Sequence, residues 1–280
     1  MKNFLLYGKS VRTVLDLSIF GFKITNIKPD IHINITSGNI PGIKKKDIYK
    51  ISDQHSHFYR EGVGLFEVIN GQEINIICET TSHNLIAQYL INFPLALCFS
   101  QKNFLVLHAS AVKYKNKVIA FCGKSHSGKS TTSALFHMYG GSLLTEDIAI
   151  LDANKDYGLV PSEAFVKLSG DSAEDLGIHE TIKGLSSIKE RKYFKLKSFS
   201  AEYIKIDNLF FLNWGNKTQI KKIKTEDVFK NLYKFSYLSD TSTSALKILR
   251  FTKDISFNSL IIEKRFSKRG DLIKVIDQFI

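Results

Sequence analysis

The first 80 residues alternate short apolar runs with turn residues. The runs DIHINIT (30–36) and GVGLFEVINGQEINIICE (62–79) are rich in Ile, Val and Phe, and Ser-Gly, Pro-Gly and Asn-Gly pairs separate the apolar stretches. This composition is typical of strands joined by tight turns, with Asn70-Gly71 as the clearest hairpin signal. The pattern predicts a mainly antiparallel sheet in a small β-rich N-terminal region, residues 1–82.

From Thr81 the apolar residues recur at helical rather than strand spacing. Ser82 is a suitable N-cap for the helix, and Pro94 predicts that it kinks or ends there. The apolar positions at this spacing are Leu85, Ile86, Tyr89, Leu90 and Phe93. The helix opens the second predicted unit, residues 83–280.

Strand-like and helix-like segments alternate through the middle of the chain. FLVLHASAV (104–112) and KVIAFCG (117–123) predict two adjacent strands in a hairpin, KSTTSALFHMY (129–139) a helix, and SLLTEDIAIL (142–151) another strand. The later elements are a loop-rich region to about residue 200, a strand at 206–214, a helix near 225–237 and an amphipathic helix at 271–280. This order predicts an α/β fold with a mixed sheet.

Composition narrows the class of protein. With 280 residues, 44% hydrophobic, and only 17 Gly and 4 Pro, the chain supports a packed core, which excludes a disordered or collagen-like chain. Three cysteines are an odd number in a chain too long to need disulfides, which favours a reducing compartment. Lys9, Arg12 and Asp16 interrupt the N-terminal apolar run, and no run reaches the roughly 18 residues of a membrane-spanning helix. We therefore expect a cytoplasmic protein with no membrane partner.

The net charge of +12 is concentrated in the C-terminal third. Residues 183–280 hold 21 Lys and Arg against 10 Asp and Glu, a balance of +11, whereas residues 1–182 hold 18 against 17, a balance of +1. KKIK (221–224) and EKRFSKR (263–269) raise the alternative of nucleic-acid binding, but they lack regular aromatic interleaving. The other interpretations are an acidic peptide partner and a generic Lys-rich composition.

Residues 123–130, Gly-Lys-Ser-His-Ser-Gly-Lys-Ser, match GxxxxGK[ST] at every fixed position. In this phosphate loop the glycines let backbone N–H groups point at phosphate oxygens, Lys129 adds a positive charge, and the Ser130 hydroxyl ligates Mg²⁺. The alternative is a chance Gly/Ser-rich turn, but the strand before and the helix after favour nucleotide binding. The predicted ATP-binding residues are Gly123, Lys124, Ser125, His126, Ser127, Gly128, Lys129, Ser130 and Thr131.

Two further features carry candidate catalytic groups. Glu146-Asp147 is the only acidic pair between Lys129 and residue 170 that follows an apolar strand, and it is either a metal- and proton-binding pair or a solvated turn. His108 lies in the middle of the predicted strand 104–112, where it is either a satisfied core histidine or a group that orients a catalytic carboxylate.

The segments LHASAV, GKSHSGKST and LLTEDIAIL together resemble the HPr kinase/phosphorylase-like proteins over about residues 83–200. Those enzymes share a core with phosphoenolpyruvate carboxykinase and transfer phosphate to a serine hydroxyl. In the family a histidine, the phosphate loop and an Asp-Asp pair follow one another at the intervals at which His108, residues 123–130 and Glu146-Asp147 occur here. The resemblance implies a P-loop kinase core.

The chain departs from this family in three places. Glu146 stands where the family usually has Asp, the loop continues as Ser-Thr-Thr instead of Ser-Glu, and the downstream E-x-R-G-x-G motif is absent. These departures argue against phosphorylase activity and against HPr as the acceptor. PSEAFVKLSGD (161–171) and the following Arg191-Lys192 are similar to shorter relatives, including kinases that phosphorylate a C-terminal serine of lasso-peptide precursors.

The resulting hypothesis is an ATP-dependent serine kinase that acts on a peptide or protein. Lys129 would hold the phosphates, Ser130 and Asp147 would bind Mg²⁺, and Glu146 or Asp147 would accept the hydroxyl proton with support from His108. The sequence does not assign base and metal ligand within the pair, nor the oligomeric state. The rival hypotheses are a non-catalytic ATP-binding regulator and a nucleic-acid-binding ATPase.

Three other sets of residues have alternative interpretations. Arg191 and Lys192 are either a clamp for a phosphate or an acidic peptide, or part of a solvated loop. His55 and His57 would share one strand face, but they lack further partners at metal-ligand spacing, so we expect surface residues. Cys122 is interpreted as a small buried apolar residue.

Overall fold

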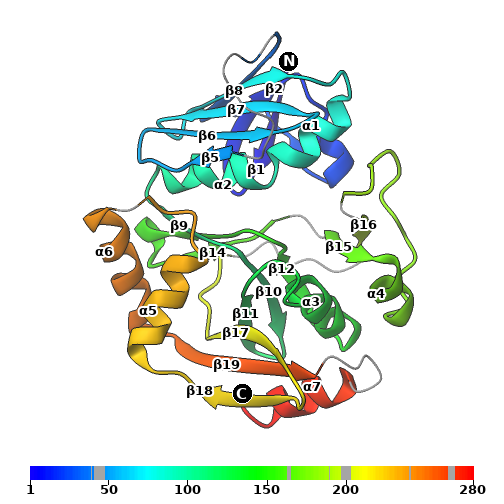
Figure 1. Ribbon diagram of the computed structural model, residues 1–280, viewed down its shortest axis with the longest axis vertical. Coiled ribbons are helices and arrows are strands. Elements are labelled where there is room, and N and C mark those ends of the chain that lie inside the picture. Colours follow the sequence, from blue (N-terminus) through cyan, green and yellow to red (C-terminus); the bar gives the residue numbers. More distant parts are fainter. Residues whose placement is uncertain are drawn as a thin grey trace.

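Eight strands from the first 78 residues form one sheet at the N-terminal end of the molecule (Figure 1). The computed structural model describes residues 1–38, 40, 48–162, 165–188, 190–196, 203–239, 241–263 and 269–280. The strands are β1 (Lys2–Leu6), β2 (Lys9–Thr13), β3 (Lys23–Ile24), β4 (Ile31–Ser37), β5 (Ile48–Lys50), β6 (His55–Arg60), β7 (Gly64–Ile69) and β8 (Glu73–Cys78), in the order β3-β1-β2-β4-β8-β7-β6-β5. The sheet is mainly antiparallel, as predicted, but β4 pairs in parallel with both β2 and β8.

Asn70 and Gly71 form the turn between β7 and β8, which confirms the predicted hairpin. Both residues have positive φ, 51° and 63°, and the Gln72 N–H donates to the Ile69 carbonyl oxygen at 3.0 Å. Gly71 lies against the Cys98 carbonyl oxygen and the Lys102 side chain, so the turn is also a packing contact.

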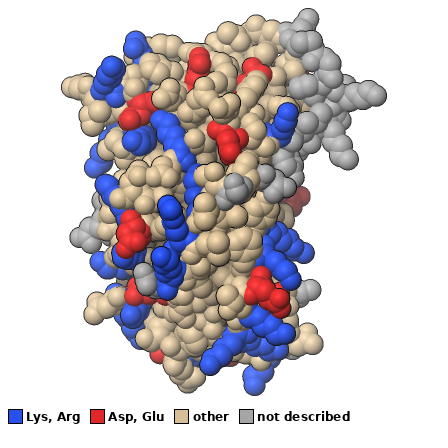
Figure 2. Space-filling view, turned by 90° about the vertical axis from the view of Figure 1, so that its left-hand side faces the viewer, with Lys and Arg blue, Asp and Glu red and all other residues tan. Residues whose placement is uncertain are grey.

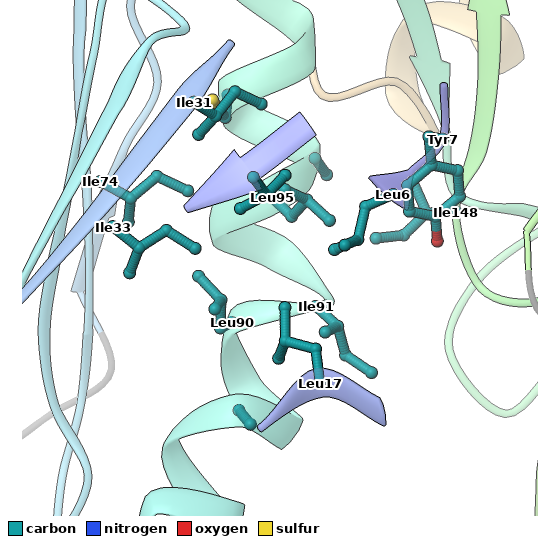
Figure 3. Close-up of a cluster of buried hydrophobic side chains, with 14 of the residues drawn as sticks. Leu6, Tyr7, Leu17, Ile31, Ile33, Ile74, Leu90, Ile91, Leu95 and Ile148 are labelled. Carbon is teal, nitrogen blue, oxygen red and sulfur yellow. The ribbon is translucent and has the colours of Figure 1, made fainter. Parts of the chain in front are cut away.

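Two helices cover one face of this sheet. Ser82 caps α1 (His83–Leu90) by accepting the Leu85 N–H, as predicted. The helix ends at Leu90, and Pro94 lies in the first turn of a second helix, α2 (Phe93–Ser100), where its missing N–H costs no hydrogen bond. Figure 3 shows side chains of the N-terminal strands directed toward this helical layer.

A six-stranded mixed sheet forms the second half of the molecule. Its strands are β10 (Ala109–Tyr114), β11 (Lys117–Cys122), β12 (Ser142–Thr145), β17 (Asn208–Gly215), β18 (Gln219–Lys222) and β19 (Ser256–Glu263), in the order β12-β10-β11-β17-β19-β18. β10 and β11 form the predicted hairpin, and β11, β17 and β19 run parallel. The α/β fold class with mixed sheets is therefore confirmed.

Helices cover both faces of the six-stranded sheet (Figure 1). One face packs against α3 (Lys129–Met138) and α7 (Arg269–Asp277), and the other against α5 (Thr225–Lys234) and α6 (Ser242–Phe251). Neighbouring residues of β11 alternate between these layers: Phe121 packs with the first and Ala120 with the second. The predicted helices near 129–139, 225–237 and 271–280 are confirmed. The sequence pattern did not reveal α6, β19 or the short 3-10 helices η1 (Leu17–Phe20), η2 (Ala153–Lys155) and η3 (Thr252–Asp254).

Two of the predicted strands are wrong, because each is divided between two sheets. Residues 104–112 form β9 (Phe104–Leu107) and β10, and residues 142–151 form β12 and β13 (Ala149–Asp152). β9 and β13 join β14 (Gly158–Val160) in a separate three-stranded sheet. His108 therefore lies at a strand break rather than in mid-strand, and Glu146-Asp147 lies at the corresponding break, where Asp147 has φ 67°.

The region expected to be loop-rich contains a further small sheet. β15 (Phe165–Ser169) pairs with β16 (Arg191–Lys195), and α4 (Gly170–Asp175) follows β15. Residues of β15 and β16 share one buried cluster with the N-terminal sheet, α1 and α2. The boundary at residue 82 stays a prediction. No helix among the described residues is long and apolar enough to cross a membrane.

Candidate active site

The phosphate loop connects the end of β11 to the start of α3, in the strand–loop–helix order that the motif requires. Gly128 is the N-cap with φ 93° and contributes no side-chain cap to α3. The Lys129 ammonium donates to the carbonyl oxygens of Gly123 and Lys124 at 2.9 and 3.0 Å, and burial lowers its pKa. The Ser127 hydroxyl is buried with no hydrogen-bond partner among the described residues. An uncapped helix N-terminus, a buried ammonium and an unused hydroxyl together suit an anion.

Glu146 lies beneath the first turn of α3. Its side chain is almost fully buried, and Ser130 Oγ donates to Glu146 Oε1 at 2.7 Å. The other carboxylate oxygen is 3.7 Å from Lys167 Nζ. Burial raises the pKa of Glu146 even though Lys167 opposes that shift.

Asp147 has a different environment from its neighbour. Its Oδ1 is 3.0 Å from His108 Nε2, and its Oδ2 forms an ion pair and hydrogen bond with Lys167 Nζ. Burial alone would raise its pKa, but Lys167 and His108 together outweigh burial and hold it well below the usual range. Asp147 is therefore ionised at neutral pH and also reachable, with about a quarter of its side chain exposed.

Lys167 is the site residue that the sequence analysis missed. It comes from β15 and contacts both acids, and its ammonium donates to Asn92 Oδ1 at 2.9 Å. Burial opposes its charged form, but Asp147 and Glu146 together raise its pKa above the ordinary lysine value. The available signal was a lone lysine between two apolar residues, Val166 and Leu168, because a lysine in a buried strand is seldom left without a partner.

A small cavity of about 60 Å³ joins the phosphate loop to these groups. The structure brings His108, Lys129, Ser130 and Asp147 to its wall, together with Lys167. The other predicted ATP-binding residues on this wall are Ser125, His126, Gly128 and Thr131. The cavity wall does not include Gly123, Lys124, Ser127 or Glu146. The first three lie elsewhere in the loop, and Glu146 accepts the hydrogen bond from Ser130.

Arg191 and Lys192 do not act together, because consecutive residues of β16 point to opposite faces. An Arg191 guanidinium nitrogen lies 3.0 Å from His126 Nδ1 of the phosphate loop, whereas Lys192 is exposed. The arrangement places one cation of the pair beside the loop. It supports a phosphate clamp by Arg191 alone.

Two larger cavities flank the phosphate loop, and both include His126 and Arg191. The first, about 240 Å³, is walled mainly by Leu135, Trp214, Ile262 and Leu272. Trp214 donates its indole N–H to the His126 carbonyl oxygen at 3.1 Å, and its ring lies directly against Gly128. The second, about 270 Å³, is walled by aromatic residues from β6, α1, α2 and β16 and opens onto His108, Asp147 and Lys167.

The remaining candidates lie outside this site. His55 pairs with Glu67 at 3.5 Å on β6 and β7, and the described residues contain no group of three or more His, Cys, Asp or Glu that could hold a metal. Cys122 is fully buried, which raises its pKa to about 12 and agrees with a structural role. KKIK (221–224) runs from the edge strand β18 into the following turn, and most of EKRFSKR (263–269) lies outside the described residues.

Comparison with known proteins adds little to this description. No family model matches the chain, and no curated protein does. Among solved structures the chain is similar to the HPr(Ser) kinase/phosphatase from Coxiella burnetii, with 10% sequence identity, a TM-score of 0.29, and coverage of 62% of this chain and 95% of that one. A TM-score this low carries no argument about activity, so a functional assignment depends on the contacts above.

Proposed function

We propose that this protein is an ATP-dependent kinase that transfers the γ-phosphoryl group to a serine or threonine hydroxyl of a peptide or protein. The main support is the cavity that holds an ionised carboxylate, Asp147, within one small space with the phosphate loop and Lys129. Phosphoryl transfer depends mostly on positioning and charge stabilisation, and these groups provide both.

In this mechanism the acceptor hydroxyl oxygen forms a bond to the γ-phosphorus while the bond from that phosphorus to the β–γ bridging oxygen breaks, and ADP leaves. Asp147 accepts the hydroxyl proton and later passes it to water. His108 and Lys167 hold both Asp147 oxygens, so the carboxylate keeps one orientation. Lys129 and Arg191 balance the negative charge of the phosphates.

The hydrogen bond between Ser130 and Glu146 supports these two residues, rather than Ser130 and Asp147, as the side chains that would hold Mg²⁺. A hydroxyl and a carboxylate oxygen are ligands that Mg²⁺ accepts, and Glu146 Oε2 has no hydrogen-bond partner among the described residues. Bound Mg²⁺ would neutralise charge on the β- and γ-phosphates. This assignment leaves Asp147 as the base, a division that the sequence alone left open.

The cavity beside Trp214 suits the nucleobase. It begins at Gly128 and Thr131 of the phosphate loop and has a flat aromatic ring and aliphatic walls, which favour a planar heterocycle. Its wall includes no carboxylate from the catalytic pair. ATP would therefore lie with its base toward α7 and its phosphates under the loop.

The first experiment incubates the protein with ATP, Mg²⁺ and serine-containing peptides and follows added phosphate by mass spectrometry. We expect Lys129→Ala and Asp147→Asn each to lower the rate about a thousandfold, because each removes a charge that acts in the transition state. Lys221→Ala, an exposed lysine on the edge strand, is the matched control. Circular dichroism checks that the variants fold.

Other outcomes identify the rival functions. Phosphorylation that survives in both variants would contradict the mechanism. ATP binding with no phosphorylated product would favour the regulatory protein, and a salt-dependent shift with DNA or RNA would favour the nucleic-acid-binding ATPase. The neighbouring genes test the finer proposal of a cytoplasmic kinase for a ribosomal peptide: a short precursor with a C-terminal serine would support it.

A further inference from the structure

We propose that the acceptor enters through the aromatic cavity between the N-terminal sheet and the phosphate loop, and that it is a flexible peptide segment. Beside its serine or threonine this segment carries a large apolar side chain and a carboxylate. The inference rests on the proposed kinase function and names the substrate class for that site. It gives the N-terminal sheet a direct part in substrate binding.

Access to the base selects this cavity over its neighbour. The proton acceptor Asp147, with His108 and Lys167, lines the cavity that faces β6, α1 and α2. The cavity beside Trp214 lies on the other side of the loop and includes none of these three groups. An acceptor hydroxyl must reach Asp147 and the terminal phosphate together, so it approaches from the N-terminal side.

Aromatic rings line the approach. Phe58 of β6 packs on Phe93 of α2 with ring centroids 5.2 Å apart, and Phe93 packs edge-on against Tyr237 at 5.5 Å. Tyr237 is not part of the cavity lining, but its ring centroid lies 6.4 Å from that of His108, so ring contacts connect the N-terminal sheet to His108. Phe58, Tyr89 and Phe93 remain partly exposed. Such a wall favours a large apolar or aromatic side chain next to the acceptor hydroxyl.

The charges that line the cavity favour an anionic group on the acceptor. The lining includes the cations Arg60, Lys167 and Arg191 against one carboxylate, Asp147. Lys167 contacts the acid pair, Arg191 contacts the phosphate loop, and the Arg60 guanidinium lies 5.5 Å from the Tyr89 ring centroid. Arg60 belongs to β6, so a carboxylate that extends from the acceptor hydroxyl toward the N-terminal sheet approaches its guanidinium.

The size of the cavity favours a flexible segment over a folded surface. Its volume of about 270 Å³ lies near the lower end of ligand pockets, with room for the acceptor side chain and one or two neighbours. A rigid domain could not bring a hydroxyl past β6 and α2 to Asp147 without inserting a loop or a chain end. The complementary occupant is thus a short extended stretch.

A peptide library with a fixed central serine and randomised flanking positions tests the preference. We expect enrichment of Phe, Tyr, Trp or Leu together with Asp, Glu or a free C-terminal carboxylate. Enrichment of basic residues, no preference, or phosphorylation of sugars and other small alcohols in place of peptides would overturn the inference. Phosphorylation confined to intact folded proteins would overturn it as well.

Variants then locate the binding site, using the best library peptide as the probe. Arg60→Gln and Phe58→Leu should each raise the KM for that peptide about tenfold, the size expected for one charge-assisted or aromatic contact, without a matching rise in the KM for ATP. Arg12→Gln, an exposed arginine of the same sheet, is the matched control. Trp214→Leu should raise the KM for ATP without a matching rise in the KM for the peptide.

The two proposals fail in different ways. If ATP binds but neither peptides nor folded proteins are phosphorylated, the kinase function itself is wrong. If peptides are phosphorylated but the KM for the peptide is the same in Arg60→Gln, Phe58→Leu and Arg12→Gln, the kinase stands and the acceptor does not use this cavity. A KM that rises only when lysines of β18 are replaced would place the acceptor on the C-terminal basic surface.

Discussion

Two neighbouring acids acquire opposite proton affinities through their surroundings. Glu146 faces inward, where burial disfavours its charge, whereas Asp147 faces the cavity between Lys167 and His108, which favour its charge. A single ammonium, from Lys167, contacts both. Carboxylates whose environments separate their pKa values take different chemical roles, and this separation is what supports Asp147 as the base.

Glu146→Gln should increase stability at neutral pH. The folded-state pKa of Glu146 is raised, so the folded protein binds this proton more tightly than the unfolded chain, and stability is lost as pH rises through that pKa. Glutamine cannot ionise and can still accept the Ser130 hydrogen bond. Urea unfolding should show the variant as the more stable protein at pH 7, with the difference fading toward about pH 4, near the ordinary glutamate pKa.

Ser130→Ala is the control for that experiment, because it removes the hydrogen bond that Glu146→Gln keeps and leaves the Glu146 charge in place. It should lower stability at both pH values. A Glu146→Gln variant that is less stable than the unchanged protein at pH 7 would show that Lys167 compensates the buried charge more fully than burial disfavours it.

At the scale of single elements, the sequence predicted the loop-to-helix motif and the hairpins but not the strand breaks. FLVLHASAV is apolar on both sides of His108, so hydrophobicity alone cannot show that its first half pairs with β13 and its second half with β12. The polar residues at the two breaks were the available signal, because they interrupt the apolar runs where the chain changes sheets. The same breaks bring His108 and Asp147 together.

The turn between β7 and β8 and the turn between β6 and β7 allow a matched pair of glycine substitutions. Gly71 and Gly62 both have positive φ, but a Cβ on Gly71 would lie 2.7 Å from the Cys98 carbonyl oxygen, whereas a Cβ on Gly62 would meet nothing within 4 Å. Gly62→Ala should cost about 1 kcal/mol of unfolding free energy for the strained backbone alone. Gly71→Ala should cost at least about 1 kcal/mol more, because the α2 backbone must shift.

Urea unfolding of the two variants measures the difference. Equal losses would mean that the hairpin moves away from α2 at no cost, in which case the turn is not a packing contact. Proteolysis in the hairpin provides a second readout, since a displaced turn is cut faster.

At the scale of the whole molecule, the site draws on segments that are distant in sequence. Asn92, Lys167 and Arg191 line one cavity with residues of the phosphate loop, and the N-terminal sheet, α2 and the β15–β16 pair share one buried cluster. Hydrophobic periodicity identifies helices and strands one at a time and does not show which of them pack together. The sequence therefore predicted residues 1–82 as a separate region, without showing that side chains of this region line a cavity beside the phosphate loop. Two aromatic contacts carry this connection: Phe20 lies 5.9 Å from both Phe165 and Tyr193.

Part of the C-terminal excess of positive charge has a structural explanation. Figure 2 shows Lys and Arg side chains spread along one face, with Asp and Glu between them. Lys221 and Lys222 lie on β18, the edge strand of the six-stranded sheet, where charge prevents pairing with the edge of another molecule. The acid pair and the phosphate loop lie elsewhere, so net charge alone does not locate the substrate.

Because the N-terminal sheet and the core share a cluster, we expect them to unfold together. Leu6 is fully buried in the cluster that also holds Ile148, the residue that follows Asp147 (Figure 3), whereas Leu5 of the same strand is 39% exposed. Leu6→Ala should lower the unfolding free energy by about 3 kcal/mol, and Leu5→Ala by less than about 1 kcal/mol. Trp214 is the only tryptophan in the sequence and lies on β17 of the six-stranded sheet, so its fluorescence reports on the C-terminal half alone. In Leu6→Ala the Trp214 transition should shift as far as the far-UV circular dichroism transition. A Trp214 transition that stays in place while the circular dichroism shifts would show two independently folding units and would separate the proposed acceptor wall from the catalytic core.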